Sequence, residues 1–255
     1  MPLSMPPANR LAQKGTVYLV GAGPGAADLL TLRGFWLLQT ASVIVHDSLV
    51  SPEMYRDLPA ERIDAGKRSG NHGLNQTQIN QLLIDLARQN HAVVRLKGGD
   101  PYVLGRGSEE ALALAQVGVP CEVIPGVSSA LAAPLLSGIP LTHRGLADSF
   151  CVVSAHPQHE GQLPAIPPYD PRRTLVILMG VQTAEVWLQQ LEIQGYPRDL
   201  PLAFAKHASW PEAQTWTTTL GNFPQDLLLH PLTAPAVAII GHVVSLRNSL
   251  PHEAP

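Results

Sequence analysis

The sequence predicts an α/β protein built of two domains. In the first half, short apolar runs alternate with segments whose apolar residues recur at helical spacing, and glycine-rich turns follow several runs. Such alternation is typical of right-handed βαβ units in a mainly parallel sheet. The pattern changes near residues 140–148, PLTHRGLAD, which we interpret as the joint. We expect domains over 15–140 and 141–250, with 1–14 and 251–255 as tails.

The first domain should contain short strands separated by helices. The helix over 76–90 is the clearest, because its apolar residues share one face and Thr77 is available as an N-cap. Two further helices are predicted over 29–41 and 108–116. The expected strands are Thr16–Val20, Ser42–Val45, Arg62–Asp64, Val93–Leu96 and Cys121–Ile124.

The second domain should be a mixed sheet with hairpin character, its strands partly antiparallel. One long helix is evident around 183–195, and the proline-rich stretch 157–171 is predicted to be an exposed loop. The expected strands are Phe150–Ser154, Thr174–Met179, Leu202–Ala205, Gln214–Leu220 and Val237–Ile240. Ligands of open α/β sheets lie at the carboxyl ends of strands, so a cleft between the two sheets is the expected site.

Composition argues for a globular chain without nucleic acid or a membrane as partner. Hydrophobic residues make up 45% and charged residues 15%, and the net charge is −3 with no dense Lys/Arg run. The proline-rich beginning lacks the apolar core of a signal peptide, and no apolar stretch is long enough to cross a membrane. We therefore expect a cytoplasmic protein. Cys121 and Cys151 lie in apolar runs and are predicted to be buried, unreactive thiols.

Residues 93–110, VVRLKGGDPYVLGRGSEE, are the most informative segment. A buried strand runs into a Gly-Gly-Asp-Pro turn, where glycines let a ligand approach the main chain and Pro101 fixes the loop shape. A second glycine pair brackets Arg106 before a helix opens with Ser108, Glu109 and Glu110. A strand, an open turn and charged side chains at a helix start predict a ligand site.

The GAGPG turn over 21–25 has three open interpretations. It follows a strand as a dinucleotide-binding loop does, but Pro24 intrudes and the GxGxxG spacing fails at Ala26. The second strand ends His46-Asp47-Ser48, so no acidic residue ends it in the way expected of a dinucleotide-binding site. A tight ligand-facing turn of another kind, or a purely structural turn, fits these residues better than a nicotinamide site.

Several charged residues have both a structural and a functional interpretation. Asp47 ends a strand and could cap the next helix or act as a general base. Lys67 and Arg68 could form a solvated turn or hold a substrate with several carboxylates. Arg106 and Arg144 fit the second idea, because guanidinium groups bind carboxylates through two hydrogen bonds. Lys97 could be structural.

Other chemistries lack their residues. His156 and His159 are close in sequence, but the spacing suggests no third ligand, so no metal site is expected. There is no GxSxG or Cys–His nucleophile pattern and no GxxxxGK[ST] loop, which removes the evidence for a hydrolase or a kinase.

Taken together, an ordered set of motifs resembles the uroporphyrinogen-III C-methyltransferase family within the tetrapyrrole methylase superfamily. The set is VYLVGAGPG, LLTLRG, VIVHDSLVS, GKR, VVRLKGGDPYVLGRGSEE, VIPGVSSALA, GIPLTHR and VILMG. GAGPG or GGDP alone would indicate only the superfamily, whereas KGGDP…GRGSEE with GIPLTHR is more specific. The similarity runs from about Gly15 to Leu250.

The resemblance implies a fold and a reaction. The fold would be two α/β domains of the tetrapyrrole methylase type with the active site in the cleft between them, assembled as a homodimer. The reaction would transfer methyl groups from S-adenosylmethionine to C2 and C7 of uroporphyrinogen III, giving precorrin-2 and S-adenosylhomocysteine. Sirohaem, cobalamin or haem d1 would be the end product. A sister precorrin methyltransferase and a non-catalytic binding protein remain the alternatives.

The resemblance also implies residue roles. Asp47 matches the proton acceptor and Lys67 the proton donor, and Arg106 with Glu109 is the rival arrangement for moving the proton. Contacts to the cofactor would come from Pro24, Gly98, Gly99, Asp100, Val103, Ser128, Ser129, Met179 and Ala208. Contacts to the macrocycle, which carries eight carboxylates, would come from Arg68, Arg106, Arg144 and Met179.

The chain departs from the family pattern in two places, on either side of Asp47 and near Ala208. An aromatic residue is usual where His46 stands, and a basic one is frequent at Ser48. Substrate contacts near Asp47 could therefore differ. Glycine is common near Ala208, but that contact would use the main chain, so we expect little effect.

Overall fold

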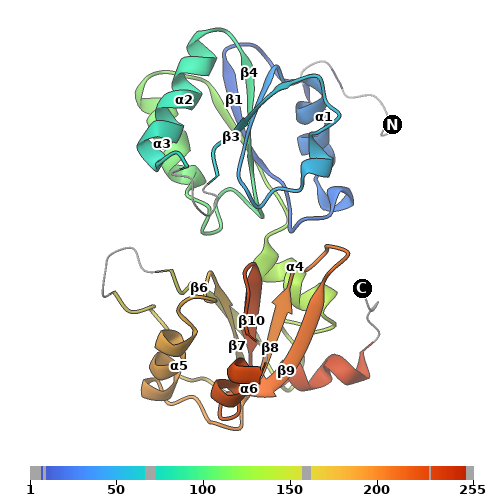
Figure 1. Ribbon diagram of the computed structural model, residues 1–255, viewed down its shortest axis with the longest axis vertical. Coiled ribbons are helices and arrows are strands. Elements are labelled where there is room, and N and C mark those ends of the chain that lie inside the picture. The colour runs from blue at the N-terminus through green and yellow to red at the C-terminus, as the bar shows by residue number, and fades with distance from the viewer. Residues whose placement is uncertain (1–6, 8–9, 67–72, 157–161, 230, 251–255) are drawn as a thin grey trace. The chain divides into compact units, whose positions relative to one another are not determined.

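The computed structural model describes residues 7, 10–66, 73–156, 162–229 and 231–250 (Figure 1). The chain forms two compact units, Met1–Ser128 and Ser129–Pro255. Each unit is built around one five-stranded sheet, as expected for a chain with two α/β domains.

The first unit contains a parallel sheet. Every pair of neighbouring strands in it is parallel, as the alternation of strands and helices predicts. In sheet order the strands are β3 (Glu61–Asp64), β2 (Val43–His46), β4 (Ala92–Lys97), β1 (Thr16–Gly21) and β5 (Cys121–Ile124). The helices are α1 (Leu32–Thr40), α2 (Gln76–Arg88) and α3 (Gly107–Gln116), with short 3₁₀ turns over Ala27–Leu29 and Pro52–Met54.

Helices cover both faces of this sheet, and each face has its own core. Because side chains alternate along a strand, Val94 and Leu96 of β4 pack with α1, whereas Val93 packs with α2 and α3. Figure 1 shows α1 on one side of the sheet and α2 and α3 on the other. Arg95 and Lys97 share the face of Val93, which brings two cations beneath α2 and α3.

The helix starts differ in detail from the sequence expectation. The cap of α2 is Asn75, not Thr77, because the Asn75 side chain accepts from the Gln78 amide at 3.0 Å and Gln78 reciprocates. The predicted helix over 29–41 is a short 3₁₀ turn followed by α1. Thr31 caps α1, its hydroxyl accepting from the Gly34 amide at 3.2 Å.

The second unit contains a mixed sheet, as predicted. β6 and β7 are parallel, and the remaining neighbours are antiparallel. In sheet order the strands are β6 (Ser149–Ser154), β7 (Arg173–Leu178), β10 (Ala236–Ile240), β8 (Pro201–Lys206) and β9 (Gln214–Thr219). The helices are α4 (Ser129–Leu136), α5 (Ala184–Ile193) and α6 (Phe223–Leu229), with a 3₁₀ segment over His242–Ser249. Part of the predicted loop, 162–170, is described and contains no helix or strand.

Helix α4 was not expected, and it moves the boundary between the units. Residues 129–136 lie before the predicted joint at 140–148, yet α4 contacts β7, β8 and β10. Ala130 and Ala133 are buried in the core of the second unit. The division therefore falls after Ser128 and not after Pro140. Helix α6 was also missed, because its seven residues are too few to show a helical period.

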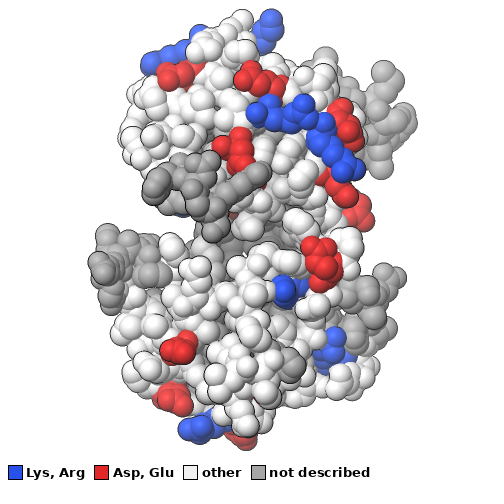
Figure 2. Space-filling model, in the orientation of Figure 1, with Lys and Arg blue, Asp and Glu red and all other residues white. Residues whose placement is uncertain are grey.

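The described residues on the face drawn in Figure 2 show no large patch of a single charge. On the face drawn in Figure 2, basic and acidic side chains are interspersed in small groups among uncharged residues. No helix in the described ranges combines the length and apolar composition that a bilayer span requires.

Candidate active site

The carboxyl edge of the first sheet gathers the glycine-rich motifs. β1 ends at Gly21 and leads into GAGPG, β4 ends at Lys97 and leads into Gly98 and Gly99, and β5 is followed by Gly126. β2 ends at His46, so Asp47 follows at the same edge. Since parallel strands end on one side, motifs distant in sequence meet there.

Three glycines at this edge touch backbone to backbone. A Cβ on Gly21 would lie 2.6 Å from both the Gly126 Cα and the Gly99 carbonyl oxygen. A Cβ on Gly126 would lie 2.3 Å from the same Gly99 oxygen. No side chain fits at these distances, so the close approach itself requires glycine.

Hydrogen bonds fix the two turns against each other. Gly23 and Gly99 exchange both backbone bonds, with N···O distances of 3.1 and 2.8 Å. The Asp100 carboxylate accepts from the Tyr102 amide at 2.8 Å and from the Gly126 amide at 3.1 Å. Asp100 therefore holds the GGDP turn in shape, a structural task for a residue predicted to contact the cofactor.

Gly98 is the open position of this edge. Among the described residues, a Cβ there would meet only the Leu49 Cβ, at 3.7 Å, which is an ordinary contact. No described residue of the first unit therefore requires a glycine at 98. A ligand lying against the main chain would require it, because only glycine leaves that space free.

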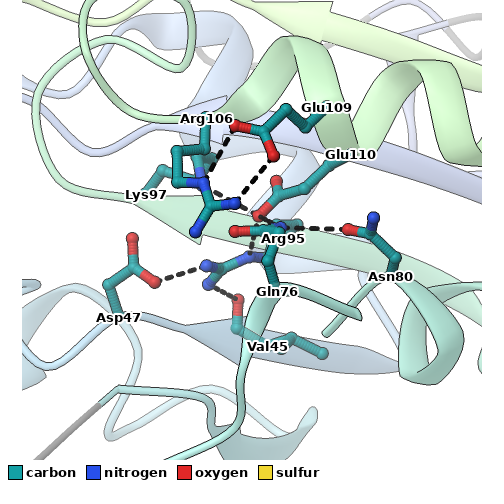
Figure 3. A network of polar contacts seen from close by, with 9 residues as sticks. All are labelled: Val45, Asp47, Gln76, Asn80, Arg95, Lys97, Arg106, Glu109 and Glu110. Atoms are coloured by element: carbon teal, nitrogen blue, oxygen red, sulfur yellow. Dashed lines mark hydrogen bonds and ion pairs between the residues drawn. The ribbon is translucent and has the colours of Figure 1, made fainter. Parts of the chain in front are cut away.

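A network of buried charges lies behind the edge (Figure 3). Glu110 of α3 is completely buried, and its Oε1 accepts from Lys97 Nζ at 2.9 Å and Arg95 Nε at 3.2 Å. Gln76 Nε2 of α2 donates to the same oxygen at 3.3 Å and to Asn80 at 2.9 Å. Glu110 Oε2 is buried without a hydrogen-bond partner among the described residues. One carboxylate oxygen thus anchors both cations.

Arg95 connects this network to Asp47. Its Nη2 donates to Asp47 Oδ1 and its Nη1 to the Val45 carbonyl at 3.4 Å. The Arg95 side chain is 2% exposed, whereas that of Asp47 is 31% exposed. Burial opposes charge on Arg95, but the Asp47 and Glu110 carboxylates outweigh it and raise the pKa of Arg95. Arg95 is thus a permanent buried cation.

Lys97 has the opposite balance. Burial, followed by the charge of Arg95, lowers the pKa of Lys97, although Glu110 and Asp47 act in the other direction. Its Nζ faces Glu110 and its side chain is 3% exposed. This geometry fits the structural interpretation of Lys97.

Arg106 and Glu109 form a separate pair at the start of α3. Arg106 Nε and Nη2 donate to the two Glu109 oxygens at 2.9 and 2.7 Å. The hydrogen bond to Arg106 lowers the pKa of Glu109, and the same bond raises the pKa of Arg106. Both side chains are about half exposed, so they are available to a ligand. Arg106 itself has φ +58°, a left-handed conformation that the Gly105–Gly107 bracket accommodates.

His46 and the loop after Gly99 complete the first unit. His46 is buried and stacks on Tyr55 with ring centroids 4.3 Å apart, so an aromatic-like ring fills the place where the family has an aromatic residue. Val103 is 39% exposed, beside the exposed Tyr102 and Leu104. Pro24 is partly buried in the GAGPG turn, and Ser128 is buried at the end of the unit.

In the second unit, two predicted contacts lie at the corresponding sheet edge. Met179 follows β7 and Ala208 lies two residues after β8, and these strands run in the same direction on either side of β10. Met179 and the neighbours of Ala208, His207 and Ser209, all have positive φ. Left-handed non-glycine residues cluster at functional sites, which supports a ligand role for this edge.

Two of the remaining predicted residues belong to the second unit, and two have no described position. Ser129 begins α4, and Arg144 is exposed in a turn closed by the His143–Ala147 bridge. Lys67 and Arg68 lie outside the described residues. In the described part of the chain, no group of three His, Cys, Asp or Glu side chains could hold a metal ion.

Sequence reasoning missed Arg95 and underrated Glu110. A charged residue in the middle of an otherwise apolar strand is the signal that could have identified Arg95, because it needs a buried partner. For Glu110 the signal was ambiguous. Adjacent glutamates open α3, and only the packing shows that Glu109 faces outward and Glu110 inward.

Comparisons with known proteins find clear relatives of this chain. The sequence profile of the family described as Tetrapyrrole (Corrin/Porphyrin) Methylases matches residues 16–224. A siroheme synthase of Chromobacterium violaceum is 44% identical over 241 residues, which are 92% of this chain and 51% of the relative. A uroporphyrinogen-III C-methyltransferase of Paracoccus denitrificans is 42% identical over 95% of this chain and 86% of the relative. The chain thus spans about half the length of the siroheme synthases that it matches.

Solved structures resemble the whole chain. The uroporphyrin-III C-methyl transferase of Thermus thermophilus complexed with S-adenyl homocysteine has a TM-score of 0.80 at 41% identity, covering 91% of this chain and 99% of that one. A cobalt precorrin-4 methyltransferase shares the fold at a TM-score of 0.76 and 24% identity. The profile match, the relatives and the parallel sheet with its glycine-lined carboxyl edge lead to one conclusion: this chain belongs to the tetrapyrrole (corrin/porphyrin) methylase family.

Proposed function

We propose that this protein transfers methyl groups from S-adenosylmethionine to C2 and C7 of uroporphyrinogen III, giving precorrin-2. The observation that carries the proposal is the carboxyl edge of the first sheet. There Gly98, which follows β4, has an open side, and the partly exposed Asp47 follows the neighbouring strand β2 at the same edge. The relatives named for this reaction supply the identity of the substrates, and one solved relative was complexed with the demethylated cofactor.

The residues of the edge fit S-adenosylmethionine. A Cβ at Gly98 would occupy space that the fold leaves open, which is the property expected of a main-chain ligand contact. When bound, S-adenosylmethionine supplies a methyl group on a sulfonium, already an activated electrophile. We assign the cofactor contacts to Pro24, Gly98, Gly99, Asp100, Val103, Ser128, Ser129, Met179 and Ala208.

The protein's contribution would be alignment and proton transfer. Holding the ring carbon in line with the methyl group accounts for much of the acceleration in such reactions. Methylation must be accompanied by the loss of a proton from the macrocycle, and Asp47 is our first candidate to accept it, with Lys67 as donor. Arg106 with Glu109 is the rival arrangement. Arg106 is nonetheless well suited to bind a substrate carboxylate, because its guanidinium is half exposed.

Binding of an octacarboxylate by a chain of net charge −3 requires local cations. We assign this task to Arg68, Arg106 and Arg144, with Met179 as an apolar neighbour of the macrocycle. We also propose that the protein acts as a homodimer and has a cytoplasmic location. A sister precorrin methyltransferase is the second candidate, and its substrate would differ only in the macrocycle.

Anaerobic incubation with uroporphyrinogen III and methyl-labelled S-adenosylmethionine tests the proposal. We expect products carrying one and then two labelled methyl groups, with the mass and absorbance of precorrin-1 and precorrin-2. Precorrin-2 offered as the substrate is the matched control. Methylation of precorrin-2 but not of uroporphyrinogen III would overturn the proposal in favour of the sister enzyme. Cofactor binding without any labelled product would indicate a non-catalytic protein.

A further inference from the structure

We propose that Arg95 is a positioning residue for the reaction: a buried cation, anchored by Glu110, that fixes the direction in which Asp47 presents its carboxylate. This inference rests on the proposed function, in which Asp47 accepts the proton.

The argument starts from the shape of the Arg95 side chain. A guanidinium is planar and carries its donors in a fixed fork. Nε is held by Glu110 at 3.2 Å and Nη1 by the Val45 carbonyl at 3.4 Å, which sets the plane (Figure 3). From this fixed plane, Nη2 donates to Asp47 Oδ1.

Arg95 and its anchor Glu110 are buried, whereas Asp47 is accessible from the surface. Arg95 is 2% exposed and Glu110 is completely buried, so neither can reach a ligand at the surface of the edge. Asp47 can reach such a ligand, because its side chain is 31% exposed. Arg95 cannot carry the proton itself, because arginine does not lose its charge in proteins. Among the residues that Arg95 contacts, Asp47 is therefore the one through which it can act on a ligand at this edge.

The charges of the network explain why a test must change two residues together. Arg95 and Lys97 balance Asp47 and Glu110, so the four formal charges sum to zero. Removing Arg95 alone would leave buried Glu110 with one cation fewer, a change that destabilises a fold whatever its catalytic role. The double variant Arg95→Met with Glu110→Gln removes one charge of each sign and keeps the interior neutral.

A double-mutant cycle between this pair of changes and Asp47→Asn tests the inference. We expect Arg95→Met/Glu110→Gln to fold and to bind S-adenosylhomocysteine within about twofold of the wild type, but to lower kcat by about 10- to 100-fold, part of the usual contribution of a general base. In the Asp47→Asn background, the same two changes should lower kcat by less than about twofold. The control is Arg33→Met/Glu122→Gln, which removes a two-bonded ion pair (2.8 and 3.0 Å) in the same unit. Its kcat should match the wild type.

Two results would overturn the inference. The first is a loss of kcat that is equal with and without the Asp47 carboxylate, since Arg95 would then act independently of Asp47. The second is a crystal structure of Arg95→Met/Glu110→Gln in which the Asp47 carboxylate keeps its wild-type direction. The crystal structure decides the inference even if the wild-type protein proves inactive with uroporphyrinogen III, an outcome that would refute the proposed function alone.

Discussion

Replacing Gly98 with alanine should weaken cofactor binding without weakening the fold. The added methyl group would have the Leu49 Cβ as its single neighbour within 4 Å among the described residues, at 3.7 Å. Gly98 does not have a positive φ, so alanine introduces no backbone strain there. Gly99 has φ +67°, and a branched residue at 99 would disturb the turn itself. Gly98 is therefore the cleaner position at which to test the ligand contact.

The structure predicts that Gly98→Ala raises the free energy of unfolding but lowers the affinity for the ligand. A glycine-to-alanine change that the native backbone accommodates stabilises a protein by about 0.4–1 kcal/mol, because the unfolded chain loses freedom. Forcing a methyl group into space that a bound ligand needs costs about 1–3 kcal/mol, by analogy with overpacking. We therefore expect affinity for S-adenosylhomocysteine to fall by at least about fivefold, since about 1.4 kcal/mol corresponds to a factor of ten.

Calorimetric titration with S-adenosylhomocysteine and urea unfolding measure the two effects on one protein. Gly126→Ala is the matched control: its methyl group would lie 2.3 Å from the Gly99 carbonyl oxygen, so this variant should lose stability by about 1–3 kcal/mol or more. If Gly98→Ala binds the ligand as tightly as the wild type, the open side of Gly98 does not face the cofactor and the assignment of this edge fails.

Two further predictions concern the surface pair and a thiol. Arg106→Asn, which suits the left-handed backbone at this position, should lower kcat/KM for uroporphyrinogen III by about 10-fold or more and leave cofactor affinity unchanged. The control is Arg172→Asn, which removes an exposed ion pair elsewhere. Equal kinetics in the two variants would exclude Arg106 from the site. Burial raises the pKa of the Cys121 thiol from 9.0 to about 11, so the folded state holds this proton more tightly than the unfolded state. The stabilisation is complete below pH 9 and is lost as pH rises towards 11, which urea unfolding across this range should show as a steeper decline in the wild type than in Cys121→Ala. Equal slopes in the two proteins would contradict that shift.

Most of the fold could be predicted because its elements have strong local patterns. The strands of the first unit are apolar and bounded by glycine or polar turns, and α2 has a regular apolar face. Helix α4 could not be predicted in the same way. It is rich in alanine and leucine with Pro134 inside, so it shows almost no preferred face, and its place is decided by packing against the second sheet. The predicted boundary at 140 failed for the same reason.

The candidate site could be predicted only in part. Glycine spacing located the GGDP and GAGPG turns, because close backbone approach restricts residue type at single positions. The buried network escaped, because Arg95 and Glu110 are separated by fifteen residues and meet only when α3 packs on β4. The sequence also could not show which of the adjacent residues Glu109 and Glu110 faces the interior. The identities of the ligands came from family resemblance and not from the residues alone.

The backbone contact among Gly21, Gly99 and Gly126 has a consequence for how this sequence can vary. The atoms that a new Cβ on Gly21 or Gly126 would strike are main-chain atoms of the other two glycines, and these atoms are present whatever residues stand there. A substitution at Gly21 or at Gly126 therefore cannot be compensated by a second substitution at one of the other glycines. The motifs can vary at the positions next to these glycines but not at the glycines themselves. Directed evolution of cofactor preference is therefore restricted to the neighbouring positions.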